Sequence, residues 1–167
     1  LSDPVGRHLP ALRGTRFGDL PLLHLATHTF GGLPLQVPDG IRDDEHLFAY
    51  LRKWRPEHAP GTMRTYANPS IGILGVVAAR SLGQGFAPLV EGRLFPALGM
   101  RRSFLDVPDT HRADYAQGYT GDGAPVRMTP GVLGAEAYGV KTNAADLLRY
   151  VAAHMGLATL EPALRRA

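Results

Sequence analysis

Residues 59–72 of this 167-residue chain read APGTMRTYANPSIG, which combines a turn, an extended segment and a helix start in direct succession. The proline-glycine pair opens the stretch as a turn. Because a residue that precedes proline is pushed away from helical backbone angles, residues 65–68 are predicted to be extended. Pro69 then suits the first turn of a helix. Tyr66 and Asn68 are therefore predicted to lie on a loop just ahead of a helix N-terminus, a place where polar groups meet polarised ligands.

Two further blocks flank this stretch. Residues 25–38 read LATHTFGGLPLQVP, and residues 130–141 read PGVLGAEAYGVK. In this order and at this spacing, the two blocks and the Tyr-Ala-Asn tripeptide at 66–68 strongly resemble the class C serine β-lactamases. The resemblance covers essentially the whole chain, whereas the chain corresponds to only about the middle half of that family. We therefore expect a fragment of a larger β-lactamase-like fold.

Two motifs that define the chemistry of this family are absent from the 167 residues. None of the four serines, Ser2, Ser70, Ser81 and Ser103, has a lysine three positions later, so there is no Ser-x-x-Lys nucleophile motif. Lys141-Thr142-Asn143 is the nearest approach to the family's Lys-Thr-Gly motif, and it lies in the wrong block. The chain by itself is therefore expected to be inactive.

The predicted fold class is mainly α, the helical region of the serine β-lactamase/penicillin-binding-protein-like α/β fold, with a small β-hairpin. We expect one helical domain over residues 1–167. Helical periodicity and end signals predict helices at about residues 20–29 (capped by Asp19), 43–54, 69–83, 86–98 and 144–155, a short strand at 103–107, and a hairpin around 121–123. The remainder, residues 156–167, is read as a connection to structure that these residues do not include.

The resemblance implies functional roles for four side chains. In the family, the tyrosine of the Tyr-x-Asn motif lies beside the catalytic serine and acts in proton transfer, which makes Tyr66 the candidate catalytic residue. Asn68 matches an asparagine that contacts the substrate's side-chain amide and the catalytic lysine. Gln36 matches a position near the substrate side chain. Tyr138 matches a tyrosine that lines the pocket below that side chain.

Each of these residues also has a purely structural interpretation. A free tyrosine, with a pKa of about 10, is a poor base at neutral pH, and a loop tyrosine usually does no more than cap a turn. Asn68 precedes a proline and suits turn chemistry. Gln36 is read equally well as an exposed loop residue, and Tyr138 as part of the core.

Composition and spacing exclude several other classes. The 18 basic residues, which together with 15 acidic residues give a net charge of +3, are scattered along the chain, so no nucleic-acid partner is predicted. His24 and His28 are four residues apart, but no third ligand follows at a sequence spacing typical of metal sites. We therefore expect no metal and no cofactor. No apolar run approaches the roughly 18–20 residues of a membrane span. Zero cysteines exclude a disulfide framework.

Three functions are consistent with these observations. The first is a fragment of a class C β-lactamase that acts on β-lactam antibiotics in the periplasm, as the resemblance implies. The second is a related serine esterase or D-alanyl-D-alanine peptidase. The third is a non-catalytic helical binding module. For any of them, an apolar face left uncovered would favour self-association.

Overall fold

The structure is a computed structural model that describes residues 1–162, and the chain divides into two compact units. The first unit contains Leu1–Phe86 and Pro130–Gly139, and the second contains Ala87–Thr129 and the chain from Val140 onwards. The predicted fold class is confirmed, because helices dominate the described residues and the sheet is one two-stranded hairpin. The expectation of a single domain over residues 1–167 stays a prediction.

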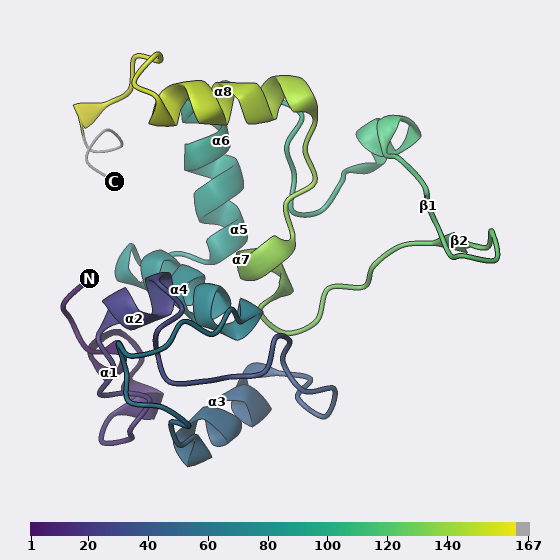
Figure 1. The fold of residues 1–167 in the computed structure, drawn as a ribbon. Coiled ribbons are helices and arrows are strands. Elements are labelled where there is room, and N and C mark those ends of the chain that lie inside the picture. The colour runs from purple at the N-terminus through teal and green to yellow at the C-terminus, as the bar shows by residue number, and fades with distance from the viewer. Residues whose placement is uncertain (163–167) are drawn as a thin grey trace. The chain divides into compact units, whose positions relative to one another are not determined.

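The first unit is built around the helix that follows the Tyr-Ala-Asn tripeptide (Figure 1). Its elements are α1 (Val5–His8), the 3₁₀ helix η1 (Pro10–Leu12), α2 (Leu22–Ala26), α3 (Asp44–Lys53), α4 (Asn68–Ser81) and α7 (Gly134–Tyr138). Helix α4 packs against α1, α2 and α7, while α3 packs against η1. Segments from both ends of the unit therefore surround α4.

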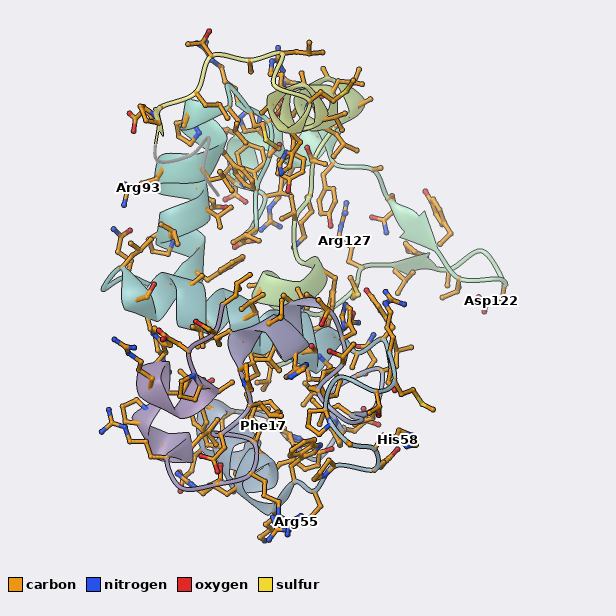
Figure 2. All side chains as sticks on the ribbon, turned by 60° about the vertical axis from the view of Figure 1, so that its left-hand side comes forward. Phe17, Arg55, His58, Arg93, Asp122 and Arg127 are labelled. Carbon is orange, nitrogen blue, oxygen red and sulfur yellow. The ribbon has the colours of Figure 1, made fainter. Side chains whose placement is uncertain are left out.

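One apolar cluster holds the first unit together. Phe17 lies inside the unit in Figure 2, and Arg55 and His58 lie at its edge. The Phe17 ring meets the Trp54 ring edge to face at a centroid distance of 5.3 Å, and the Trp54 indole N–H donates a 2.7 Å hydrogen bond to the carbonyl of Gly32. The buried Trp54 thus keeps its one polar atom satisfied while its ring fills the core.

From Ala87 onwards the second unit contains a continuous helical rod, drawn in teal in Figure 1, made of α5 (Phe86–Leu89, whose first residue belongs to the first unit), the π-helical η2 (Val90–Leu94) and α6 (Phe95–Ala97). It continues with the 3₁₀ helix η3 (Asp109–Asp114), the strands β1 (Gly118–Tyr119) and β2 (Pro125–Val126), and α8 (Ala144–His154). The strands are antiparallel and pair Gly118 with Val126. Figure 2 shows Asp122 at the tip of this hairpin.

Most of the predicted elements are confirmed. Helix α3 starts at Asp44, one residue after the predicted start, and Asp43 caps it: the Asp43 carboxylate accepts a 2.8 Å hydrogen bond from the His46 N–H. Asn143 caps α8 in the same way, through a 2.9 Å bond from the Asp146 N–H. The hairpin around residues 121–123 is also present. Local side-chain chemistry was sufficient to predict these features because both partners of each bond lie within a few residues.

The predicted helix at residues 20–29 is shorter than expected. Asp19 does not cap it, since α2 starts at Leu22 and the first free N–H groups, of Leu22 and Leu23, donate instead to the carbonyls of Asp3 and Leu1 at 3.0 and 2.9 Å. The helix ends at Ala26, before His28 adopts a left-handed φ of 59°. A distant segment thus supplies the cap, and a non-glycine residue stops the helix.

The strand predicted at residues 103–107 is wrong. Phe104 forms an isolated bridge with Lys141, with backbone N–H to carbonyl distances of 2.8 and 2.7 Å. The ladder does not continue, and the polar groups of the next residue are bound elsewhere: the Leu105 N–H donates to a Glu91 carboxylate oxygen at 2.6 Å, and the Leu105 carbonyl accepts from the Lys141 amine. Part of the predicted connection at 156–167 lies outside the described residues.

Over the residues that the structure describes, no single helix is long and apolar enough to cross a membrane. Within residues 1–162, one bent pair of helices, Asn68–Ser81 with Phe86–Ala97, passes the length and composition test when the two are taken together.

Candidate active site

The predicted catalytic segment lies against the turn that follows α2. The N–H of Gly61 donates to the carbonyl of Thr29 at 2.8 Å, and the N–H of Thr65 donates to the carbonyl of His28 at 2.9 Å. Further on, the buried Ser70 hydroxyl donates to the carbonyl of Leu25 at 2.6 Å. Residues 61–70, called here the tyrosine segment, are therefore held along their whole length by residues 25–29.

Glycine is required where the chain leaves this turn. Gly31 has a φ of 110°, and its carbonyl accepts the Glu57 N–H at 2.8 Å. A side chain at Gly31 would place its Cβ atom 2.6 Å from the His58 carbonyl oxygen, closer than real Cβ atoms approach. Only glycine combines that positive φ with the close passage of residues 56–58. This turn directs the following loop, which contains Gln36, towards the tyrosine segment.

Tyr66 lies at the surface of the first unit, with 52% of its side chain exposed. Its ring leans on the imidazole of His28, with centroids 4.6 Å apart and ring planes 42° from parallel. The guanidinium of Arg64 lies 6.0 Å from the centre of the same ring. The phenol is thus open to solvent while its ring is supported by a buried imidazole and lies near a cation.

Asn68 is the first residue of α4 and is half-buried. Its N–H donates to the carbonyl of Leu35 at 2.9 Å, which ties the start of α4 to the loop residue just before Gln36. The Gln36 side chain is exposed. The structure therefore brings the backbone positions of Tyr66, Asn68 and Gln36 into one neighbourhood.

Tyr138 ends α7, which packs on α4 through close backbone contact. A Cβ atom on Gly72 would lie 2.7 Å from the Cβ of Leu133, so glycine on α4 is what lets α7 approach. Tyr138 is half-buried, and its hydroxyl folds back over Gly134, where an added Cβ atom would lie 3.5 Å away. Among the described residues, no hydrogen bond or ring contact joins Tyr138 to Tyr66, so their grouping on one open face stays a prediction.

Three of the chain's serine hydroxyls are already engaged. Ser70 is fully buried, and its hydroxyl donates to Leu25, whereas Ser81 donates to the Ala78 carbonyl at 2.7 Å. Ser103 is buried beside Asp146, at 2.9 Å from its carboxylate. Ser70 and Ser103 are too buried to be accessible nucleophiles, and the exposed Ser81 hydroxyl is bonded to a carbonyl of its own helix. This agrees with the absence of the Ser-x-x-Lys motif from the sequence.

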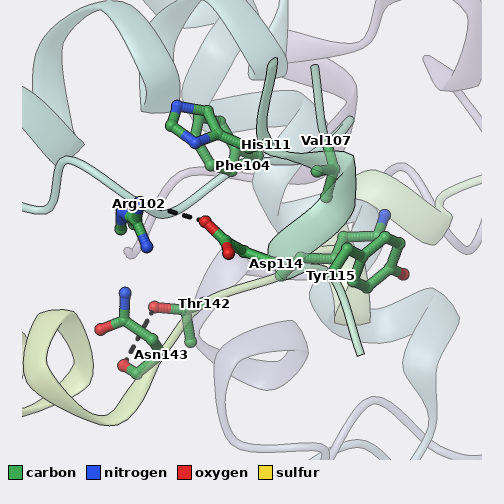
Figure 3. Close-up of a pocket in the computed structure, with 9 residues that line it drawn as sticks. Arg102, Phe104, Val107, His111, Asp114, Tyr115, Thr142 and Asn143 are labelled. Atoms are coloured by element: carbon green, nitrogen blue, oxygen red, sulfur yellow. Dashed lines mark hydrogen bonds and ion pairs between the residues drawn. The ribbon is translucent and has the colours of Figure 1, made fainter. Parts of the chain in front are cut away.

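The second unit contains a hollow of about 110 Å³, shown in Figure 3. Arg102 and Asp114 form a 3.1 Å ion pair across it, and Phe104 stacks on His111 with centroids 5.0 Å apart. The Lys141 amine donates to the Leu105 carbonyl at 2.6 Å, so this lysine is engaged within its own unit. The volume is well below the roughly 300–1,000 Å³ of ordinary ligand sites. We therefore do not assign the candidate site here.

The two histidines on α2 and its following turn bind protein groups. The Nδ1 atom of His24 lies 2.9 Å from the Thr29 hydroxyl, and the Nδ1 atom of His28 accepts the Ala67 N–H at 3.4 Å. No group of three potential ligands suited to a metal occurs within residues 1–162. Sequence reasoning treated His28 solely as a metal candidate and missed its contact with Tyr66, because thirty-eight positions separate the two residues and no local pattern links them.

Burial lowers the pKa of the His28 imidazole below its ordinary value, and the nearby Arg64 charge lowers it further. Both effects disfavour a second proton on the ring. A neutral imidazole protonated on Nε2 is the form whose Nδ1 atom accepts the Ala67 N–H. The electrostatics and the hydrogen bond therefore favour the same state of the ring.

Comparison with solved structures defines the fold. The chain superposes on a β-lactamase/D-alanine carboxypeptidase from Pseudomonas syringae with a TM-score of 0.96 and 49% identity, covering 99% of this chain and 47% of that one. A class C β-lactamase from Rhodobacter sphaeroides matches with a TM-score of 0.93 and 45% identity, covering 99% and 47%. The residues described here thus have the architecture of the corresponding part of a class C β-lactamase.

Sequence comparison gives the family directly. The β-lactamase family model matches residues 1–167. A curated β-lactamase from Pseudomonas fluorescens is 50% identical over 167 residues, which is 100% of this chain and 47% of the relative. The chain belongs to the β-lactamase family, and it spans about half the length of the curated relatives that it matches. The resemblance to class C β-lactamases stated above is confirmed.

Proposed function

We propose that this chain contributes the proton-transfer group and the substrate side-chain contacts of a serine β-lactamase site. The observation that carries the proposal is the setting of Tyr66. Its hydroxyl-bearing ring is exposed, yet the backbone on either side is fixed by bonds to residues 25–29. A side chain that is accessible and also held in place is what general acid–base catalysis needs.

The reaction is the hydrolysis of a β-lactam ring through a covalent acyl-enzyme. A serine oxygen attacks the lactam carbonyl carbon, the carbon–nitrogen bond breaks, and the serine proton passes to the ring nitrogen. Tyr66 is the group that relays this proton. The serine and the activating lysines belong to motifs that the 167 residues do not contain. Water then attacks the acyl-enzyme ester and releases the opened product.

The remaining site residues are assigned to substrate recognition. The Asn68 amide both donates and accepts hydrogen bonds, which suits the side-chain amide of a β-lactam. Gln36 and Tyr138 are assigned to the same side chain of the substrate. Antibiotics of the β-lactam class are accordingly the proposed substrates, and the periplasm is the proposed location, as for the class C enzymes that the chain resembles.

A second activity is favoured by one comparison. The Pseudomonas syringae protein, at 49% identity, is described as both a β-lactamase and a D-alanine carboxypeptidase. Cleavage of a terminal D-alanine from a peptide also proceeds through an acyl-enzyme, and its leaving group is an amine. We keep this reaction as the alternative for the same residues.

A chimera tests the proposal. The matching 167 residues of the Pseudomonas fluorescens relative are replaced by this chain, and hydrolysis of the chromogenic cephalosporin nitrocefin is measured. We expect turnover by the chimera and none by the isolated chain, since loss of a serine nucleophile typically lowers turnover on the order of 10⁶-fold. Release of D-alanine from a peptide ending in D-alanyl-D-alanine is measured in parallel.

Two variants of the chimera identify the role of the tyrosine. Tyr66→Phe removes the hydroxyl and is expected to lower turnover by roughly 10²–10⁴-fold, the range for a lost general acid–base group. Tyr119→Phe, at a tyrosine 65% exposed in the hairpin, is the matched control and is expected to keep full turnover. A folded chimera that hydrolyses neither substrate, or equal turnover by both variants, contradicts the proposal.

A further inference from the structure

His28 is linked to the catalytic candidate through three separate contacts. Its carbonyl accepts the Thr65 N–H at 2.9 Å, its Nδ1 atom accepts the Ala67 N–H at 3.4 Å, and its ring lies against Tyr66 at 4.6 Å. The residues immediately before and after Tyr66 are thus bound by the same histidine. Its ring and its backbone reach them from the same side of the segment.

The backbone of His28 is held in a conformation that most residues avoid. Its φ is 59°, in the left-handed region, where non-glycine residues are uncommon. That conformation ends α2 and turns the ring of a residue that is only 7% exposed towards the tyrosine segment. A strained position beside a candidate catalytic group is typical of functional positioning.

We propose that His28 is a positioning residue for Tyr66, which it holds in place through the bond from the Ala67 N–H and through the tilted contact between the two rings, and that protonation of its imidazole releases Tyr66. The inference rests on the proposed function of Tyr66 and identifies how the site controls it. Protonation of Nδ1 removes the acceptor for the Ala67 N–H. The same event places a positive charge beside the Tyr66 ring, where Arg64 already lies.

The surroundings of the imidazole support this reading. Arg64 and Tyr66, from the tyrosine segment, are the charged or titratable side chains that contact or influence it within the described chain. His24, one turn earlier on α2, is bound to the Thr29 hydroxyl instead. No carboxylate contacts the His28 ring in residues 1–162 to stabilise its protonated form. Acidification is thus expected to break the Ala67 bond rather than strengthen it.

Asparagine is the informative substitution at position 28. Its Oδ1 atom occupies nearly the same place as a histidine Nδ1 atom, and asparagine tolerates the left-handed backbone. His28→Asn therefore keeps an acceptor for the Ala67 N–H but loses the ring and its titration. His28→Gly keeps the backbone conformation and loses the acceptor as well. His24→Asn is the matched control on the neighbouring histidine.

The first measurement uses the 167-residue chain itself. The tyrosine rings are labelled with ¹³C, the Tyr66 signal is assigned by its loss in Tyr66→Phe, and its NMR shift is followed from pH 8 to pH 5. We expect an inflection below the ordinary histidine range of about 6.5, retained in His24→Asn and absent from His28→Asn. The His28→Asn signal should not change with pH over this range, and the His28→Gly signal should move towards that of free tyrosine.

The second measurement uses the chimera described above. His28→Gly is expected to lower kcat for nitrocefin by between about tenfold and a hundredfold, as for a misplaced catalytic group, and His28→Asn is expected to restore most of it. The acidic limb of the kcat profile should lose the His28 contribution in both variants. Circular dichroism melting shows whether each variant is folded, and the His28→Asn comparison stands if His28→Gly is not.

The outcomes separate the two proposals. A Tyr66 signal that shows no inflection in the parent chain, or the same inflection in His28→Asn, overturns the positioning role whatever the chimera does. A Tyr66 signal that follows His28, combined with a folded chimera that has no turnover, supports the coupling and overturns the proposed catalytic function instead. Equal kcat and pH profiles for the parent and His28→Gly chimeras also overturn the positioning role.

Discussion

Ser70 illustrates how burial assigns a role to a single side chain. It lies two residues after Asn68 in a family whose chemistry depends on a serine, yet it is fully buried and its hydroxyl is bonded to the Leu25 carbonyl. A nucleophile must reach its substrate and pass its proton to a base. Ser70 does neither, and its bond instead joins α4 to the end of α2.

We predict that Ser70→Ala lowers stability without affecting catalysis. Loss of a buried hydroxyl hydrogen bond is expected to cost about 1–2 kcal/mol in the free energy of unfolding. Urea denaturation of the chain measures this loss, and Ser81→Ala, at an exposed hydroxyl, should change stability by less than about 0.5 kcal/mol. Nitrocefin turnover by the chimera should be unchanged in Ser70→Ala; its abolition in a folded variant would identify an unforeseen nucleophile.

The pKa shift of His28 predicts a pH dependence of stability. The folded-state pKa is lowered, so between the unfolded value of about 6.5 and the lower folded value the unfolded chain binds more protons. Stability is therefore complete above pH 6.5 and falls as the pH drops towards the folded pKa. Thermal melts from pH 7.5 to 5 should show a smaller decline for His28→Asn than for the parent chain. An equal decline in both would show that other groups account for the whole effect.

Helix α8 shows how one carboxylate organises an element. Asp146, in its first turn, is 2% exposed and accepts hydrogen bonds from the Arg102 N–H at 2.7 Å and the Ser103 hydroxyl at 2.9 Å. Arg149, one turn later, pairs with it at 2.6 Å. Burial by itself would raise the pKa of Asp146, but these hydrogen bonds and the Arg149 charge hold it below the usual range. The carboxylate thus joins residues 102–103 to the start of α8.

Replacement of this carboxylate is predicted to destabilise the second unit. Asp146→Asn keeps the shape but loses the charge, and we expect a loss of about 1–3 kcal/mol in the free energy of unfolding at pH 7. Because the folded pKa is lowered, the stabilisation is present above the unfolded value of about 3.9 and is lost as the pH falls through the folded pKa. Urea denaturation at pH 7 and pH 3 should therefore show a smaller difference between parent and variant at the lower pH. Equal stability of the two proteins at pH 7 would contradict this role.

For the molecule as a whole, the exposed apolar side chains indicate how copies of it would behave in solution. Several lie on or just after α8, and each of them is between 42% and 73% exposed: Leu147 (49%), Leu148 (67%), Val151 (42%), Met155 (67%) and Leu157 (73%). Soluble monomers rarely expose contiguous apolar patches of large area. The net charge of +3 gives only weak repulsion between copies. Self-association therefore stays a prediction, and the exposed apolar side chains on and just after α8 form the surface expected to mediate it.

We expect sedimentation velocity to show concentration-dependent association of the 167-residue chain. Leu148→Glu, in the middle of the α8 surface, should shift the distribution towards monomer because it places a charge at an apolar contact. Leu82→Glu, at a leucine 54% exposed after α4, is the matched control and should leave association unchanged. A parent chain that stays monomeric at high concentration, or an equal response to both variants, would contradict the prediction.

Much of this chain could be predicted from its sequence because the relevant interactions are local. The caps of α3 and α8 join residues three positions apart, the hairpin follows from its turn, and Pro69 sets the start of α4 next to the Tyr-Ala-Asn tripeptide. The resemblance of the Tyr-Ala-Asn tripeptide to the family motif selected Tyr66 as the candidate catalytic residue. Features that depend on neighbours in sequence, or on a motif, need no knowledge of the fold.

Tertiary packing controlled the features that local patterns left open. The first N–H groups of α2 are bound by residues 1–3, the stretch at 103–107 forms an isolated bridge to Lys141 while its Leu105 N–H binds Glu91, and His28 reaches Tyr66 across the turn that follows α2. Each of these contacts joins residues that are well separated in the chain. A buried backbone N–H group needs a hydrogen-bond acceptor, and which acceptor it binds depends on which segments the packing of the core brings close to it.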